Sequence, residues 1–165
     1  MHIVLIGLGQ SLRRDDGAGL KAVQEWLKKY PNTASHPLLR IEILELPGLG
    51  LLDLIYHAGA AIIVDAVQSG SKPGKLHLTM PSEVSDFDAG SGSAHGLGVA
   101  EVLALGRQIS PELMPEKIIF VGIEGENFDM GDHLSAAVKK SMPEVVDHIN
   151  QLVLNLLSEL EINPP

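Results

Sequence analysis

Apolar residues gather in five short runs along the chain, and most of these runs are bounded by Gly or Pro. The runs are rich in Val, Ile and Leu, which is typical of β-strands. They lie at residues 2–7, 39–46, 60–67, 75–80 and 117–125. The run at 60–67 (AAIIVDAV) is apolar on both faces apart from Asp65. It therefore predicts a central strand in a sheet that is covered on both sides.

Between these runs, apolar residues recur at the spacing of a helix. The segments with this pattern lie at residues 16–30, 49–59, 97–107 and 134–160. In the first of them Leu20, Val23 and Trp26 share one face. We expect Pro143 to begin the longer second part of the helical tail, because proline is tolerated in the first turn of a helix but not in its interior.

The alternation of strands and helices predicts the fold. It implies crossover connections, which make neighbouring strands parallel. The sequence thus predicts an α/β domain with a mostly parallel sheet of about five strands and helices on both faces. No change of composition divides the 165 residues, so we expect a single domain over residues 1–165. In such sheets, ligands bind at the carboxyl ends of the strands.

The net charge and the residue composition exclude several classes of partner and of active-site chemistry. A net charge of −9 argues against a nucleic-acid partner and against an anionic membrane surface. The absence of cysteine excludes disulfides, thiolate metal sites and cysteine nucleophiles. No apolar run approaches the ~18 residues of a spanning helix, and no signal-peptide pattern precedes the first strand. We therefore expect a soluble, cytoplasmic protein that does not bind membranes.

The loop after the first strand, GLGQSLRRDDGAG, combines glycines with two adjacent carboxylates. It begins like a dinucleotide-binding loop, but Leu12 stands where the third glycine would be, and no phosphate-loop lysine follows. Two acids would also occupy the positive end of the following helix, which a phosphate needs. Asp15 and Asp16 can serve as helix caps. Because a cap needs only one of them, the other is available for a different role.

Asp65 and His95 suggest what that role is. Asp65 ends an apolar strand, where an unpaired charge is costly to bury, so it either caps the following loop or takes part in acid–base chemistry. His95 lies in GSAHG, where small neighbours leave its ring accessible, although a single loop histidine often has no special role. Together with Asp16, these residues can converge at the strand ends. Two carboxylates and an imidazole suit a borderline divalent ion such as nickel, zinc or manganese.

Four motifs, in order, make the chain resemble the hydrogenase maturation endopeptidases, enzymes that trim the C-terminus of a nickel-iron hydrogenase large subunit. The motifs are IGLGQSLRRDDGAG, IIVDAV, SAHGLGVAEVLAL and FVGIEGENFDMGDHLSAAV. The resemblance implies a single three-layer α/β/α domain with a twisted five-stranded sheet. It also implies that Asp16, Asp65 and His95 form a metal-contacting cluster, with Asp16 and Asp65 as the catalytic carboxylates. The nickel is expected to arrive with the substrate, a large-subunit precursor that is already loaded with it.

The chain departs from the family pattern at two places. Gln10 stands where the family usually has Asn after the second glycine, which keeps the amide on a longer arm. The family's Asp-Gly-Gly-Thr-like turn after the second strand is replaced by ELPGLG, residues 45–50, where Glu45 can retain the charge. Both departures bear on substrate specificity more than on the three expected ligands.

The resemblance predicts an aspartic-type endopeptidase with nickel-dependent recognition, which works as a monomer on the hydrogenase large-subunit precursor. A carboxylate would activate water, and the sequence does not say which one. A Ser-His-Asp triad is not supported, because nothing around Ser93 activates it. Two alternatives share the ligands: a self-sufficient metallohydrolase that keeps its own metal, and a nonenzymatic nickel carrier or assembly chaperone. A peptidyl-tRNA hydrolase-like enzyme is a further alternative, disfavoured by the negative charge.

A second group, Asp129, Asp132 and His133, lies in FDMGDHLS. These residues can form another metal site. Gly131 and the helix that follows favour a turn with capping residues instead.

Overall fold

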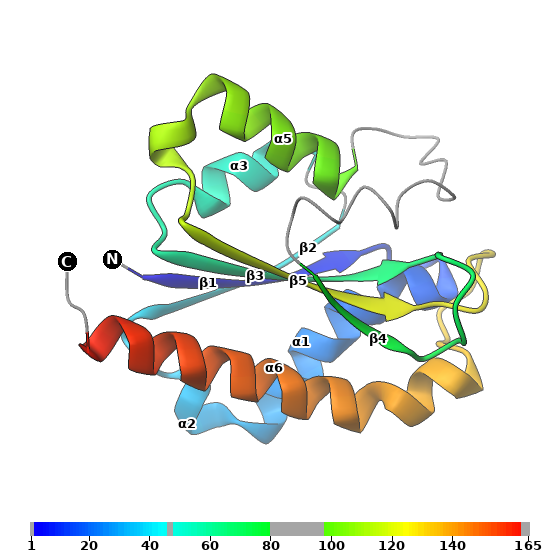
Figure 1. Ribbon diagram of the computed structural model, residues 1–165. Coiled ribbons are helices and arrows are strands. Elements are labelled where there is room, and N and C mark those ends of the chain that lie inside the picture. Colours follow the sequence, from blue (N-terminus) through cyan, green and yellow to red (C-terminus); the bar gives the residue numbers. More distant parts are fainter. Residues whose placement is uncertain (1, 46–47, 80–97, 163–165) are drawn as a thin grey trace.

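The computed structural model describes residues 2–45, 48–79 and 98–162, and these are built around one five-stranded sheet (Figure 1). The strands are β1 (Ile3–Gly9), β2 (Leu39–Glu45), β3 (Ala60–Val67), β4 (Leu76–Thr79) and β5 (Lys117–Glu124). Their order in the sheet is β2-β1-β3-β5-β4. All neighbouring strands are parallel except β4, which is antiparallel to β5. Every strand expected from the sequence is present.

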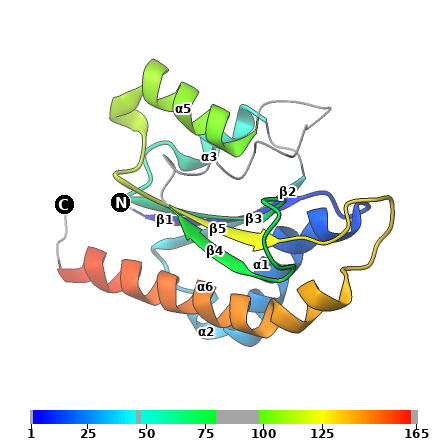
Figure 2. The same cartoon turned by 45° about the vertical axis from the view of Figure 1, so that its right-hand side comes forward.

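Helices cover both faces of the sheet, which makes three layers (Figures 1 and 2). One face carries α1 (Ala18–Lys29) and α6 (Ala136–Ile162), and the other carries α3 (Gly50–Ile55) and α5 (Val99–Ile109). The shorter elements are the 3₁₀ turns η1 (Arg14–Gly17) and η2 (Pro111–Leu113) and the single turn α2 (Pro31–Ala34). The predicted α/β fold with a mostly parallel sheet is confirmed.

Alternating side chains of the central strands fill two separate cores. Ile3 and Leu5 of β1 pack toward α1 and α6, while Val4 and Ile6 pack toward α3 and α5. All four are fully buried, as befits a strand between two helical layers. Trp26 of α1 completes the first core and is also fully buried. Burying each such side chain contributes about 1.5–3 kcal/mol.

The expectation for Pro143 is wrong. The last helix runs without a break from Ala136 to Ile162, with Pro143 inside it. Proline removes one backbone hydrogen bond, but the residues on both sides of it bury the same face. Val138 and Met142 before the proline and Val146 after it all belong to the core under the sheet. Packing therefore holds the helix together across the defect.

No helix among the described residues has the length and apolar character needed to cross a membrane.

The strand order places a topological switch point between β1 and β3. From β1, the chain moves first to β2 on one side and later to β3 on the other. The connection that leaves β1 and the connection that leaves β3 therefore run to opposite sides of the sheet, and they separate just beyond the carboxyl ends of these two strands. In open α/β sheets this switch point is where ligands bind.

Candidate functional site

The loop after β1 lies directly on the carboxyl ends of β1 and β3. Gly9 has a φ of 145°, and a Cβ there would lie 2.0 Å from the carbonyl oxygen of Asp16. A Cβ at Gly19 would lie 2.3 Å from the carbonyl oxygen of Val64 and 2.4 Å from that of Leu8. No side chain fits at such distances, so close packing of this loop requires both glycines. As a result, the turn η1, which carries Asp16, packs against the ends of both strands.

Asp15 is completely buried and binds a remote loop. Its Oδ2 accepts hydrogen bonds from the backbone N–H groups of Glu126 (2.8 Å) and Asn127 (3.0 Å). Its Oδ1 accepts one from the N–H of Ser135 (2.7 Å), just before α6. Neither η1 nor α1 has a side-chain cap, so the expectation that one of the two acids caps the following helix is wrong. Asp15 instead joins η1 to the connection between β5 and α6.

Asp16, the next residue, is only partly buried. Burial removes water from its carboxylate and raises its pKa, while the charge of Arg13 and a hydrogen bond from the Gln10 side chain oppose this shift and lower the pKa. The side-chain amide of Gln10, which stands where the family usually has Asn, thus lowers the pKa of Asp16 through a hydrogen bond. A carboxylate with a raised pKa is better suited than an ordinary aspartate to accept a proton near neutral pH.

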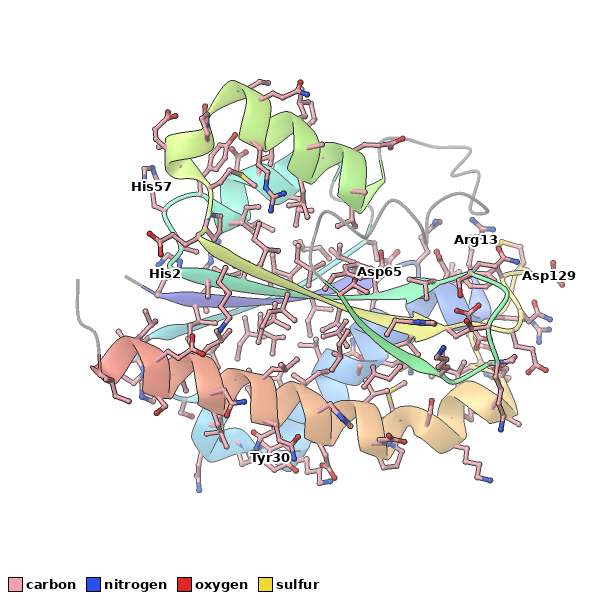
Figure 3. All side chains as sticks on the ribbon, viewed as in Figure 1. His2, Arg13, Tyr30, His57, Asp65 and Asp129 are labelled. Carbon is pink, nitrogen blue, oxygen red and sulfur yellow. The ribbon has the colours of Figure 1, made fainter. Side chains whose placement is uncertain are left out.

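Asp65 lies on the end of β3, partly buried. Asp65 lies two residues from both Ile63 and Val67, so it shares their face of β3, which packs toward α3 and α5. Figure 3 shows Asp65 on that side of the sheet. Its Oδ1 accepts a hydrogen bond from the N–H of Ala66 at 2.8 Å. This donor belongs to the next residue of β3 rather than to the following loop, so the capping of that loop stays a prediction.

The structure places Asp16 and Asp65 on segments that contact each other at the switch point. Asp65 follows Val64, whose carbonyl oxygen meets the first turn of α1, and η1 immediately precedes that helix. His95, the third expected ligand, lies outside the described residues. Within the described ranges, no three His, Asp or Glu side chains are grouped so that they could hold a metal ion. The metal-binding and catalytic roles of Asp16, Asp65 and His95 therefore remain predictions.

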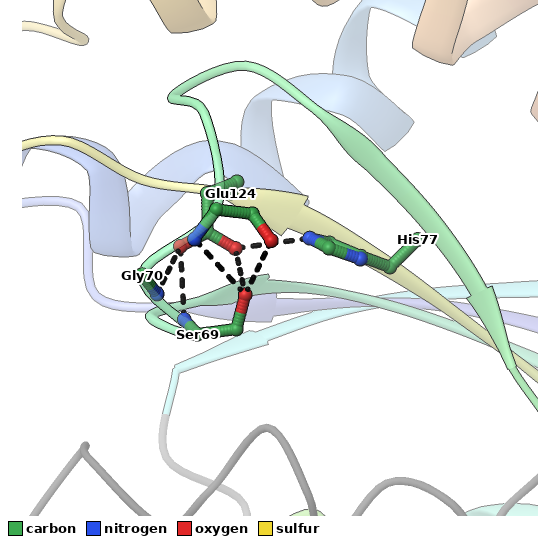
Figure 4. Close-up of polar contacts among 5 residues, drawn as sticks. Ser69, Gly70, His77 and Glu124 are labelled. Carbon is green, nitrogen blue, oxygen red and sulfur yellow. Dashed lines mark hydrogen bonds and ion pairs between the residues drawn. The ribbon is translucent and has the colours of Figure 1, made fainter.

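Glu124 is a polar residue at this end of the sheet that the sequence reasoning missed. It ends β5 and is 1% exposed. Its carboxylate accepts hydrogen bonds from the N–H of Ser69 (2.8 Å), the N–H of Gly70 (3.0 Å) and the hydroxyl of Ser69 (2.7 Å), and Nε2 of His77 lies 2.9 Å away (Figure 4). Like Asp65, Glu124 is a carboxylate at the end of an apolar strand, and this pattern in the sequence could have identified it.

The second metal group considered from the sequence forms a turn in the structure. Asp132 and His133 are both exposed, and Nδ1 of His133 lies 2.8 Å from Oδ1 of Asp132. Ser135 supplies the cap of α6, because its hydroxyl accepts a hydrogen bond from the N–H of Val138 at 3.4 Å. The preferred interpretation, a turn with capping residues, is confirmed.

Comparison with known proteins by sequence points to one family. The family model described as hydrogenase maturation protease matches residues 46–152. A hydrogenase expression/formation protein, HupD, of Bradyrhizobium diazoefficiens is 29% identical over 154 residues, with 88% of this chain and 74% of that protein covered. The hydrogenase 2 maturation protease of Escherichia coli is 26% identical over 154 residues, with 90% of this chain and 88% of the protease covered.

Comparison of structures agrees with this. The hydrogenase maturating endopeptidase HybD of E. coli shares the fold with a TM-score of 0.80 at 22% identity, and the alignment covers 94% of this chain and 93% of HybD. The [NiFe] hydrogenase maturation protease HybD of Thermococcus kodakarensis has a TM-score of 0.69 at 26% identity, covering 93% of this chain and 99% of that one. The three-layer α/β/α arrangement is therefore that of solved maturation proteases.

Proposed function

The chain belongs to the hydrogenase maturation protease family, and from this we propose that it removes the C-terminal extension of a nickel-loaded hydrogenase large-subunit precursor. The observation that carries the proposal is that η1, which carries Asp16, packs against the ends of β1 and β3, beside the strand segment that carries Asp65. Parallel α/β sheets bind their ligands at such a point.

The two carboxylates have a donor set that suits nickel carried by the substrate. Carboxylate oxygens bind borderline divalent ions, and an imidazole such as that of His95 would complete a mixed set. Docking the precursor's nickel at Asp16 and Asp65 would fix the scissile peptide bond beside them. Such positioning can lower a barrier by several kcal/mol, with about 7–11 kcal/mol in the best intramolecular cases.

We propose Asp16 as the general base, because η1 packs it against the ends of β1 and β3, and burial there raises the pKa of its carboxyl group. In this mechanism Asp16 takes a proton from water while the water oxygen bonds to the scissile carbonyl carbon. The carbon–nitrogen bond then breaks, and the proton passes to the leaving amine. The products are a shortened large subunit with a new carboxylate and a free peptide. We further propose that the protein acts on the precursor as a cytoplasmic monomer.

The decisive experiment is mass spectrometry of the cognate precursor after incubation with this protein, with and without nickel loaded. Loss of a single C-terminal peptide from the nickel-loaded form alone is the expected result. Cleavage regardless of nickel, together with one equivalent of metal retained by the purified protein, would favour a self-sufficient metallohydrolase. A precursor that binds and stays intact would favour a nickel carrier or chaperone.

A further inference from the structure

A pocket of about 240 Å³ lies between α1 and β2, beside the loop that carries Asp16. Leu20, Ile43 and Leu134 supply apolar surface that is buried or partly buried, and Lys21 and Gln24 of α1 lie exposed at its rim. Small-molecule pockets are commonly about 300–1,000 Å³. This pocket is smaller, so its size fits one or two side chains of a peptide better than a whole cofactor.

The pocket borders an open edge of the sheet. β2 pairs with β1 on one side, and within the described ranges no strand pairs with it on the other. Leu38 contacts β1 through its carbonyl oxygen, which accepts the N–H of Ile3 at 2.7 Å. Because backbone polar groups point alternately to the two sides of a strand, Ile41, Ile43 and Glu45 direct theirs outward. An edge of this kind is a template for one more strand.

The open edge leads to the candidate site. Glu45, the last residue of β2, accepts a hydrogen bond from the hydroxyl of Ser11 at 2.6 Å. Ser11 belongs to the loop that carries Asp16, so the end of β2 is tied to that loop. A peptide lying along β2 would therefore reach the loop that carries Asp16 at one of its ends.

From these observations we propose that β2 and the α1–β2 pocket form the docking site for the precursor's C-terminal extension. The extension adds to the sheet as an extra strand along β2, held by backbone hydrogen bonds, and inserts one apolar side chain beside Ile43. This inference rests on the proposed function, because the extension is the segment that the proposed reaction removes.

Strand geometry gives the number of residues between the side chain in the pocket and the scissile bond. Neighbouring strands are about 4.8 Å apart, so a strand added outside β2 runs about 10 Å from the line of β1. An extended chain covers about 3.3 Å per residue, so about three residues span that gap. The apolar side chain in the pocket is thus expected about three to four residues from the scissile bond.

The pocket selects for an apolar side chain rather than a charged one. Arg14 and Lys21 are balanced there by Glu45 and Asp132, so neither sign of charge is favoured overall. The apolar surface of Leu20 and its neighbours is the remaining source of preference. A Leu, Ile or Met side chain of the extension would bury most of its surface in the pocket. Complete burial of such a side chain contributes about 1.5–3 kcal/mol.

The first test is hydrogen exchange followed by NMR on the whole protein, with a synthetic peptide that has the sequence of the cognate precursor's C-terminal extension. We expect saturating peptide to slow exchange at the amides of Ile41, Ile43 and Glu45 at least tenfold. The amides of Arg40 and Glu42, which face β1, supply the internal control and should change less than twofold. A peptide N-methylated at alternate residues should lose the protection.

The second test uses a substitution that fills the pocket without touching the core. Gln24→Trp places a large side chain at the rim, and Gln24 is exposed, so the fold should tolerate it. We expect KM for precursor cleavage to rise at least tenfold with kcat within twofold. Gln151→Trp, the same change at an exposed position of α6, is the matched control and should leave both unchanged.

The outcomes separate this inference from the proposed function. Nickel-dependent cleavage without protection of β2 would overturn the docking site and leave the proposed function standing. Protection of β2 by the peptide with no cleavage of any precursor would uphold the docking site and reject the protease. Protection that grows with protein concentration in the absence of peptide would show that a second copy of this chain occupies the edge, and would overturn the inference.

Discussion

Two pairs of carboxylates lie at the carboxyl end of the sheet, and they differ in how deeply they are buried. Asp15 and Glu124 are 0% and 1% exposed, and each accepts at least three hydrogen bonds from loops distant in sequence. Asp16 and Asp65 are only partly buried. Asp15 and Glu124 hold the surrounding loops in place, and Asp16 and Asp65 lie on the contacting segments at the switch point between β1 and β3.

The comparison shows that residue type alone does not separate structural acids from candidate functional acids. Asp15 and Asp16 are adjacent, yet one binds three backbone N–H groups and the other has a pKa raised by burial. A buried carboxylate saturated by donors has little capacity left for a ligand.

The largest effect is expected from removing the charge of Asp16 or of Asp65. Asp16→Asn and Asp65→Asn should each abolish precursor processing, a loss of at least about 100-fold in kcat for a group that moves a proton. Unfolding free energy should change by less than about 1 kcal/mol, as is usual away from buried networks. Mass spectrometry of the precursor and urea unfolding give the two readouts. Asp129→Asn, which alters an exposed carboxylate at the same end of the sheet, is the control and should process the precursor normally. Near-normal cleavage by Asp16→Asn or by Asp65→Asn would reject the catalytic role of the residue changed.

Much of the fold could be predicted because its signals are local. The β-branched runs of β1, β3 and β5 gave the strands, and their alternation with helical segments gave the parallel sheet. Asp65 could be singled out because a carboxylate in AAIIVDAV is conspicuous against an apolar strand.

The remaining features depend on contacts between distant segments. No local pattern says that Asp15 binds residues 126–135 while Asp16 stays partly exposed, because the difference arises from where that loop packs. The helix crosses Pro143 because of core packing, which propensity does not report. Glu124 acquires its role only when the Ser69–Gly70 segment and His77 close around it.

The next largest effect concerns Asp15. In Asp15→Asn, one carboxylate oxygen becomes an NH₂ group that faces a backbone N–H, so at least one charge-assisted hydrogen bond is lost and a donor is left unpaired. We expect the free energy of unfolding to fall by about 3 kcal/mol. Urea unfolding of the variant beside Asp16→Asn is the measurement. Equal stability of the two variants would remove the distinction between the adjacent acids.

Glu124 should show a smaller and more local effect. Glu124→Gln keeps the shape but removes the charge that receives the Ser69 and Gly70 N–H groups, at a cost of about 2 kcal/mol. Amide exchange at Ser69 and Gly70 should accelerate more than exchange in β1. Glu126→Gln, an exposed neighbour, should change the stability by less than about 0.5 kcal/mol. Unaltered exchange at Ser69 and Gly70 in Glu124→Gln would mean that the carboxylate does not hold that loop.

The smallest effect is a change in pH dependence at Asp16. Burial raises the pKa of this carboxyl group in the folded protein, so the protonated form is favoured there. Its contribution to stability is therefore present below the unfolded-state pKa and is lost as the pH rises through the folded-state pKa. Activity has the opposite dependence, because a general base must be ionised, and cleavage should begin only as the pH passes the raised pKa.

Arg13 tests this assignment, because its positive charge holds the pKa of Asp16 down against burial. Arg13→Gln should move the acid limb of kcat to higher pH, because it removes the positive charge that lowers the pKa of Asp16, and the displacement should be small because a partly exposed charge pair is weak. Lys28→Gln removes the same charge from the far end of α1 and should leave the limb in place. If both variants shift the limb equally, the effect is one of net charge. If Arg13→Gln leaves it unmoved, the group that titrates in the reaction is not Asp16, and the base must be sought at Asp65.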